Sequence, residues 1–280
     1  MTGRPRRAVA RVSLNAAALV VIVASLFPVY WMVNTSLLPA SAVRSTTPHW
    51  WPDEFTLSNY QEALGDDSLV NALFNSMAVT GITLVVALAF AFLGAVAVSR
   101  YRFRTRTSFI VAILVIQMIP AEAMIVSVFR VLDGWYLLNT IIGLSFVYIA
   151  FVLPFTIWTL RGFVNGVPAD LEEAAMIDGC SRSGAFWRIT FPLLAPGLIA
   201  TGVFAFIQAW NEFVFALVIM TRPESLTLPI WLRAFVQATK ATDWAVVMAA
   251  STIMAVPVIV FFLIVQHRMT SGLVSGAVKG

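Results

Sequence analysis

Six long apolar runs constrain the fold of this chain more than any other feature. They cover approximately residues 12–37, 71–99, 108–130, 140–160, 193–221 and 243–267. Each run is long enough to supply the roughly 20 helical residues that cross the hydrocarbon core of a membrane. Because backbone N–H and C=O groups in lipid must be satisfied within the segment, we expect helices. The sequence therefore predicts an all-α, polytopic membrane protein with six transmembrane helices.

The charged residues are too few to cover a water-facing surface. They make up 11% of the chain, whereas soluble proteins carry about 25%. The net charge of +4 does not indicate a nucleic-acid partner, because membrane proteins keep Lys and Arg in their cytosolic loops. The single cysteine, Cys180, excludes an internal disulfide, and the two histidines are too far apart in sequence to predict a metal site.

The distribution of basic residues predicts the orientation. Most of the 18 Lys and Arg residues fall on the cytosolic side if the N-terminus is cytosolic, which agrees with the positive-inside rule. We therefore expect a cytoplasmic N-terminal tail at 1–11, a transmembrane permease domain at 12–267 and a cytoplasmic C-terminal tail at 268–280. The first run follows several Arg residues, as a secretory signal does, but it is longer, and we expect it to be retained as a helix.

The segment 161–192 is the largest predicted cytosolic loop, and it contains helix and turn signals. Three acidic residues follow Pro168 in a first helical turn, where the helix dipole favours anions: Asp170, Glu172 and Glu173. Gly179 ends this run, where a left-handed residue is favoured. Ser181 or Ser183 suits the N-cap of a second short helix, and Pro192 marks the return to the membrane. This helix–turn–helix pattern favours docking against a partner.

The same loop resembles the EAA loop of ATP-binding-cassette importer permeases, whose pattern is E-A-A-x-x-x-G followed by I-x-L-P. The matching residues are Glu173, Ala174, Ala175, Gly179, Ile189 and Pro192, with Phe191 in place of the usual Leu. Further matches at Asn59-Tyr60, at Asn75-Ser76, from Trp210 to Phe213 and in the glycine-rich end resemble the carbohydrate-uptake branch. Within that branch, the chain is similar to the six-helix second permease subunit of maltose-type importers.

The resemblance implies a transport subunit of the cell membrane rather than an enzyme. In this family the loop places a short coupling helix in a groove of an ATPase subunit. The implied partners are a distinct second permease, two ATPase subunits that bind ATP and magnesium, and an extracytoplasmic sugar-binding protein. The chain itself has no Gly-x-x-x-x-Gly-Lys-Ser/Thr phosphate cradle, so the ATP that drives transport must be bound by another chain.

Polar residues inside the predicted spans are candidates for the transport path, since ionisable groups in lipid are costly and usually face a cavity or a partner. The candidates are Glu122, Gln208, Trp210, Asn211 and Glu212. Trp210 would offer a flat face to a sugar ring. For Glu212 the alternative is a structural hydrogen bond between helices or interfacial snorkelling.

Small residues in the second run predict close helix packing rather than a transport role. They are Ala87, Ala89, Ala91, Gly94, Ala95 and Ala97. Three other functions stay open beside sugar import. They are an ATP-driven importer for another solute such as glycerol phosphate, an amino acid or a peptide, an ion-coupled secondary transporter, and a polytopic membrane enzyme. The last is disfavoured because the chain has no Gly-x-Ser-x-Gly or His-Glu-x-x-His motif.

Overall fold

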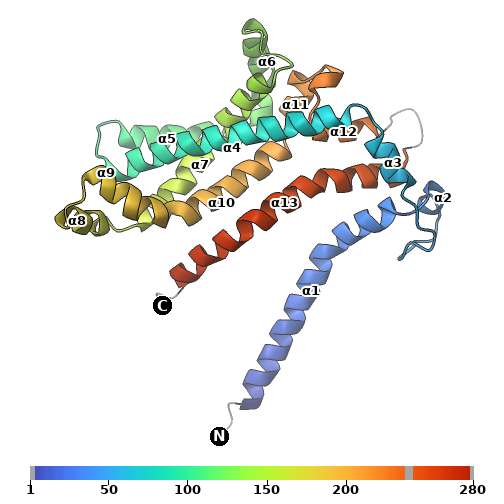
Figure 1. Ribbon diagram of the computed structural model, residues 1–280, viewed down its shortest axis with the longest axis horizontal. Helices are drawn as coiled ribbons and strands as arrows, with labels where there is room; N and C mark the ends of the chain where they lie inside the picture. The colour runs from blue at the N-terminus through green and yellow to red at the C-terminus, as the bar shows by residue number, and fades with distance from the viewer. Residues whose placement is uncertain (1–3, 237–241, 278–280) are drawn as a thin grey trace. The chain divides into compact units, whose positions relative to one another are not determined.

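The computed structural model describes the backbone of residues 4–236 and 242–277, and the side chains of residues 13–236 and 242–267. Within these ranges the chain consists of helices and connecting segments without strands, which confirms the predicted all-α class (Figure 1). The chain divides into two units. One holds residues 4–67, 232–236 and 242–256, and the other holds residues 68–231 and 257–277.

The first unit is built around the carboxyl end of a long helix. It contains α1 (Arg4–Ser36), α2 (Ala40–Val43), α3 (Ser58–Leu64), the end of α12 (Leu228–Ala234) and the start of α13 (Trp244–Ala277). The Asn59 side-chain amide donates to the carbonyls of Ser36 and Leu38, at 2.8 and 2.9 Å. This amide therefore fixes the turn that follows α1, while the side chains of 13–30 are exposed.

The second unit is a helix bundle in which α4, α7 and α10 pack together and α5 packs on α7. Besides the remaining parts of α12 and α13, its elements are α4 (Leu69–Arg100), α5 (Arg106–Gln117), η1 (Ala121–Met124), α6 (Ile125–Gly134), α7 (Ile141–Gly166), α8 (Asp170–Ile177), α9 (Arg182–Ala185), η2 (Phe186–Thr190), α10 (Phe191–Trp210), α11 (Val214–Ile219) and η3 (Pro223–Ser225).

Small residues on α4 form part of the helix contacts in this bundle. Ala87, Ala91 and Ala95 are fully buried, and each belongs to a cluster with apolar residues of α7 or α10. Their spacing places them on one face of the helix, where a small side chain lets neighbouring backbones approach closely. The predicted packing role is confirmed for these three residues, whereas Ala89 and Ala97 are exposed.

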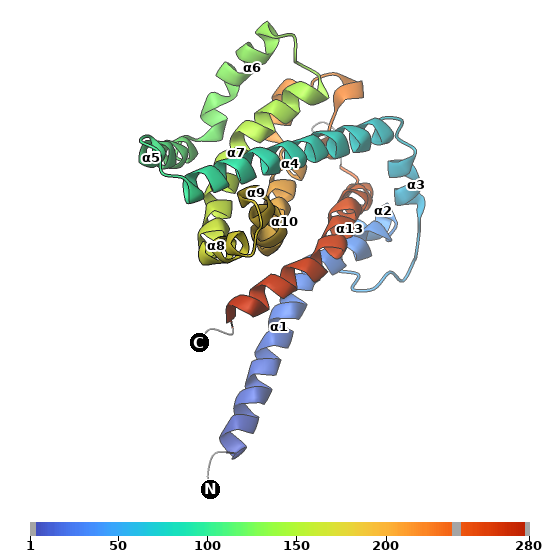
Figure 2. The same ribbon diagram turned by 60° about the vertical axis from the view of Figure 1, so that its left-hand side comes forward.

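Among the described residues, five helical stretches are long and apolar enough to cross a membrane. They are Ser13–Ser36, Leu69–Arg100, Ile141–Gly166, Arg182–Trp210 and Trp244–His267. The predicted span at 108–130 is not one straight helix, because Arg106–Gln117 and Ala121–Gly134 meet at an angle of 90° (Figures 1 and 2). Pro120 lies in the break. A proline lacks the N–H donor and disfavours a helical conformation in the residue before it.

Two other predicted boundaries also differ. The run 193–221 is interrupted after Trp210, and the chain becomes helical again at Val214. The predicted second short helix of the loop 161–192 is not separate, because Arg182–Trp210 is continuous. Its η2 segment is a π-helical turn that ends directly before α10, in which Pro192 lies near the start. The wider π turn accommodates the missing donor and bulky ring of this proline without ending the helix.

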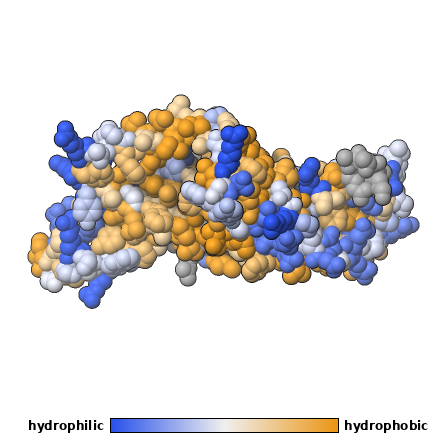
Figure 3. Space-filling view, turned by 90° about the horizontal axis from the view of Figure 1, so that it is seen from above, coloured by the Kyte–Doolittle hydropathy of each residue, from blue (hydrophilic) through white to orange (hydrophobic). Residues whose placement is uncertain are grey.

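Side-chain amides hold the segment between α11 and α12 in place. The Asn139 side-chain oxygen accepts from the backbone N–H groups of Thr221 and Arg222, at 2.6 and 2.9 Å. Asn75 donates to the carbonyls of Glu224 and Leu226, each at 3.0 Å. The family-matching Asn75 is therefore a structural residue. Hydrophobic side chains cover broad areas of the surface in Figure 3, as expected for helices that lie in a membrane.

Candidate coupling loop and transport cavity

The helix α8 ends where its sequence signals predict, but it begins later than predicted. Ala169 is the N-cap, so Pro168 precedes the helix rather than occupying its first position. Gly179 has φ +93°, as expected for a left-handed residue after a helix. The N–H of Cys180 donates to the carbonyl of Ala175 at 3.0 Å, and that of Gly179 donates to Met176 at 3.1 Å. These two bonds define a Schellman motif.

Most of the apolar side chains of α8 face away from the protein. Ala175 is 5% exposed and packs inward, but Glu173 and Ala174 are exposed. Ile177 is 87% exposed, and Leu171 and Met176 are also exposed. In both ribbon views α8 lies beside α9, at the end of α10 where that helix begins (Figures 1 and 2). Exposed apolar side chains on a short, well-ended helix are suited to docking against a partner.

The other motif residues lie on the continuous helix that follows. The Ser181 hydroxyl accepts from the N–H of Gly184 at 3.2 Å and caps its first turn. Ile189 is half-buried and Pro192 is exposed. Phe191, the departure from the family pattern, packs edge-on against Phe92 with ring centroids 5.5 Å apart. The aromatic replacement thus joins the loop to α4.

Polar residues outside the predicted site also hold this loop. Arg100 Nη2 lies 3.3 Å from Glu172 Oε1, and the same nitrogen donates to the carbonyl of Val167 at 3.0 Å. The Thr190 hydroxyl donates to Glu172 Oε1 at 2.7 Å. Sequence reasoning placed Glu172 only in the first turn of the helix. A signal for its pairing was Arg100, the basic residue at the end of α4.

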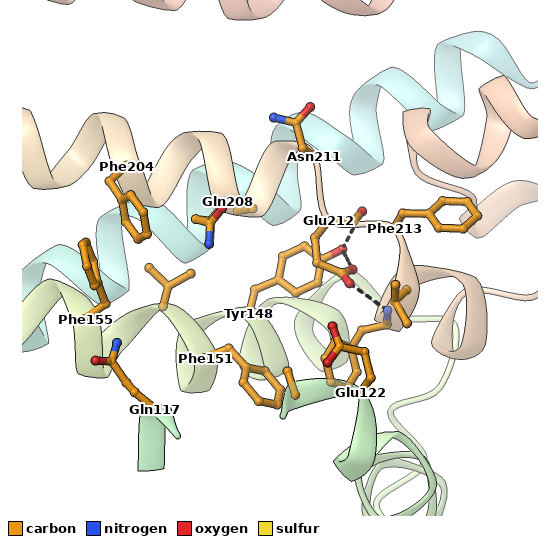
Figure 4. Close-up of a pocket in the computed structure, with 15 residues that line it drawn as sticks. Gln117, Glu122, Tyr148, Phe151, Phe155, Phe204, Gln208, Asn211, Glu212 and Phe213 are labelled. Carbon is orange, nitrogen blue, oxygen red and sulfur yellow. Dashed lines mark hydrogen bonds between the residues drawn. The ribbon is translucent and has the colours of Figure 1, made fainter. Parts of the chain in front are cut away.

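A cavity of about 570 Å³ lies among α5, η1, α7, α10 and α11 (Figure 4). It brings together four of the five predicted path residues, namely Glu122, Gln208, Asn211 and Glu212. The predicted path residues did not include the other lining residues, among them Gln117, Tyr148, Phe151, Phe155, Phe204 and Phe213. The volume falls within the range of about 300–1,000 Å³ that is typical of small-molecule sites.

Glu212 is held in place by hydrogen bonds to other parts of the protein, as a structural residue is. Its Oε2 accepts from the Tyr148 hydroxyl at 2.6 Å and from the N–H of Ala216 at 3.1 Å. Its Oε1 accepts from the N–H of Phe215 at 2.8 Å. The carboxylate therefore satisfies two free N–H groups at the start of α11, where the helix dipole favours an anion. This geometry supports the structural alternative for Glu212.

Trp210 does not line the cavity. Its side chain is 1% exposed, and its ring stacks on that of Phe206 with centroids 5.6 Å apart. The predicted flat face for a sugar is thus covered by protein. The aromatic surface of the cavity comes instead from phenylalanines such as Phe155 and Phe204, whose ring centroids are 4.0 Å apart.

The remaining polar groups differ in how free they are to meet a solute. The Asn211 amide donates to the carbonyl of Ile207 on its own helix at 2.9 Å. Glu122, Gln117 and Gln208 are exposed at the cavity wall. The 90° break before η1 turns Glu122 toward this space (Figure 4). In the described part of the chain, no group of three or more His, Cys, Asp and Glu side chains could hold a metal ion.

Comparisons with known proteins agree with this geometry. Residues 87–273 match the family of binding-protein-dependent transport system inner membrane components. The chain is 42% identical to the diacetylchitobiose uptake system permease protein DasC of Streptomyces coelicolor, over 96% of this chain and 98% of that one. It is 35% identical to the trehalose transport system permease protein SugB of Mycobacterium tuberculosis, over 91% and 93% of the two chains.

A solved structure shares the fold. A chain of a bacterial ABC transporter involved in the import of the acidic polysaccharide alginate superimposes with a TM-score of 0.78 at 23% sequence identity. The superposition covers 95% of this chain and 98% of that one. Together with the family match over most of the bundle, these similarities show that this chain belongs to the family of binding-protein-dependent transport system inner membrane components.

Proposed function

We propose that this chain is a transmembrane permease subunit of an ATP-driven sugar importer. The observation that carries the proposal is its similarity, over nearly the whole chain, to permeases named for the uptake of diacetylchitobiose and trehalose. The proposed partners are a distinct second permease, two ATPase subunits that bind ATP and magnesium, and an extracytoplasmic sugar-binding protein. The chain lies in the cell membrane, and we propose that both termini and the loop 161–192 are cytoplasmic.

In this proposal α8 is the coupling helix. Its ordered ending at Gly179 and its exposed apolar residues support docking into a groove of an ATPase subunit. Closure of the two ATPases would move α8 and switch the spans between inward-open and outward-open states. The cavity beside Glu122 would hold the solute during this switch. Its amide and carboxylate groups can accept hydrogen bonds from sugar hydroxyls, and its phenylalanine rings can pack against the apolar faces of a sugar ring.

The function is tested by reconstituting the complete complex in proteoliposomes with its binding protein. We expect uptake of a sugar that depends on enclosed ATP and persists when ionophores collapse the ion gradients. A panel of sugars, glycerol phosphate, amino acids and peptides, titrated calorimetrically against the binding protein, identifies the solute class. Uptake that follows an ion gradient without ATP would instead support a secondary transporter.

Cys180 provides a test of the proposed orientation. It is the one cysteine of the chain, and it is half-buried next to Gly179. A membrane-impermeant thiol reagent should label it in inside-out vesicles and leave it unlabelled in intact cells. Bound ATPase should reduce the labelling, since the docking surface is adjacent. Labelling of intact cells would show that the loop faces outward.

Glu122→Gln tests the proposed transport path. The substitution keeps the size of the side chain and removes its charge, so uptake per assembled complex should fall about tenfold, the factor that corresponds to one strong hydrogen bond. ATP hydrolysis without solute should persist. Gln117→Glu, which places a carboxylate elsewhere on the same wall, serves as the companion variant. If the Glu122→Gln complex shows wild-type uptake per complex, Glu122 is not part of the transport path.

A further inference from the structure

We propose that Glu172 transmits the movement of α8 to the membrane-spanning helices through a polar contact that we name the Glu172 bridge. The bridge consists of Glu172, Arg100, Thr190 and the backbone carbonyl of Val167. The inference rests on the proposed function, because it states how a coupling helix would act on the rest of this chain. It gives Glu172 a role different from that of its neighbour Glu173.

The bridge joins four segments through one carboxylate and one guanidinium. Glu172 lies on α8, and its Oε1 is 3.3 Å from Arg100 Nη2 at the end of α4. That nitrogen also donates to the Val167 carbonyl directly after α7, at 3.0 Å. The Thr190 hydroxyl, at the end of η2, donates to Glu172 Oε1 at 2.7 Å. A displacement of Glu172 therefore pulls on the cytosolic-side ends of three spans at once.

The side chains of the Glu172 bridge are largely shielded from solvent, which strengthens the contact between them. The side chains of Arg100 and Glu172 are each 15% exposed, and Thr190 is fully buried. Partly buried ion pairs are screened much less by salt than surface pairs, and the 2.7 Å hydrogen bond from the Thr190 hydroxyl to the Glu172 carboxylate is strengthened by the charge of its acceptor. Because Arg100 is at the end of a helix, its positive charge is also favoured by the helix dipole.

Apolar packing alone attaches α8 weakly. Ala175 is the side chain of α8 that is buried, whereas Leu171, Met176 and Ile177 are exposed. A cavity of about 520 Å³, whose lining includes Arg100, Glu172, Arg182 and Trp187, adjoins the bridge. The charged contact is thus not enclosed in a rigid apolar core. Loss of the contact should leave α8 folded but free to move without the spans.

The two adjacent glutamates are consequently separable by experiment. Glu173 is exposed on α8, where it is available to an ATPase subunit, and Glu172 is turned inward to the bridge. In the reconstituted complex, Glu172→Gln should retain wild-type co-purification of the ATPase. The amount of solute moved per ATP hydrolysed should fall about fivefold or more. About fivefold is the smallest effect that energetic coupling between two sites typically produces.

Matched variants define the comparison. Glu173→Gln should weaken co-purification of the ATPase while complexes that do form keep the wild-type ratio of solute to ATP. Arg100→Gln should lower the ratio as Glu172→Gln does. Arg102→Gln, which removes an exposed cation two residues beyond the end of α4, should not. Combining Arg100→Gln with Glu172→Gln should be no worse than the more damaging single change, because both remove one contact.

Thr190→Val covers the case in which the charge-removing variants assemble poorly. It keeps the buried volume and removes the hydroxyl donor to Glu172, so the ratio should fall by a smaller factor. A wild-type ratio in assembled complexes of Glu172→Gln and Arg100→Gln, or of Thr190→Val where those two do not assemble, would overturn the inference. Failure of the proposed function is distinguishable, since the wild-type complex would then show no ATP-dependent uptake.

Discussion

Gly179→Val is expected to abolish most transport and to release the ATPase subunits while leaving the chain inserted in the membrane. Gly179 has φ +93°, a region that β-branched residues strongly resist. Among the described residues other than its chain neighbours, none has an atom within 4 Å of the position that a Cβ would take, so the cost comes from the backbone conformation rather than from a clash with another segment. Such strain amounts to about 1–3 kcal/mol. Relieving it would undo the Schellman bonds and redirect the chain between α8 and Ser181.

The measurement is co-purification of the ATPase together with ATP-driven uptake, and both should fall about tenfold or more. Gly166→Val is the matched control. Gly166 also has open space around its Cβ position but no positive φ, and it lies at the end of α7 next to the same loop. Gly179→Asn should be milder, because Asn tolerates the left-handed region. Wild-type pull-down and uptake in Gly179→Val would reject α8 as the coupling helix.

The ordered ending of α8 was predictable because its cause is local. A helix that stops needs a residue able to adopt positive φ, and glycine does so at least cost. Local reasoning also predicted a cap at Ser181 or Ser183, and the structure shows that the cap is Ser181. It did not show that the capped helix continues into the next span, since Pro192 alone predicts an ending. The π turn of η2 that accommodates this proline has no equally clear sequence signal.

The roles of the polar residues near the cavity depended on contacts between distant segments. Glu212 meets Tyr148 across 64 positions of sequence, and no spacing rule predicts such a pair. Its bonds to the N–H groups of Phe215 and Ala216 are local, however, and resemble a capping pattern. That signal was missed because the run 193–221 is apolar on both sides of its polar residues at 208–212, so it was read as one helix.

The side of a helix that faces the protein was equally hard to predict in an apolar bundle. Trp210 and Gln208 are close in sequence, yet Gln208 lines the cavity and Trp210 is buried. In a soluble helix, polar residues mark the solvent face. In lipid, apolar residues face both the protein and the membrane, so composition alone does not distinguish the two directions.

Trp210→Ala is therefore expected to reduce the amount of assembled complex rather than the activity of each complex. The Trp210 ring stacks on Phe206, which in turn stacks on Phe261 with centroids 3.9 Å apart. Replacing a fully buried aromatic residue by Ala costs about 3–5 kcal/mol in soluble proteins. The part of this cost that comes from lost packing contacts applies in lipid as well, where packing drives helix association.

The measurements are the yield and thermal midpoint of the purified complex, with uptake normalised to assembled complex. Both yield and midpoint should fall for Trp210→Ala, and normalised uptake should stay close to wild type. Trp51→Ala, which removes an exposed tryptophan, should change neither stability readout appreciably, as surface substitutions usually shift stability by less than about 0.5 kcal/mol. A normal yield combined with a large loss of normalised uptake would instead mean that Trp210 contacts the solute in another transport state.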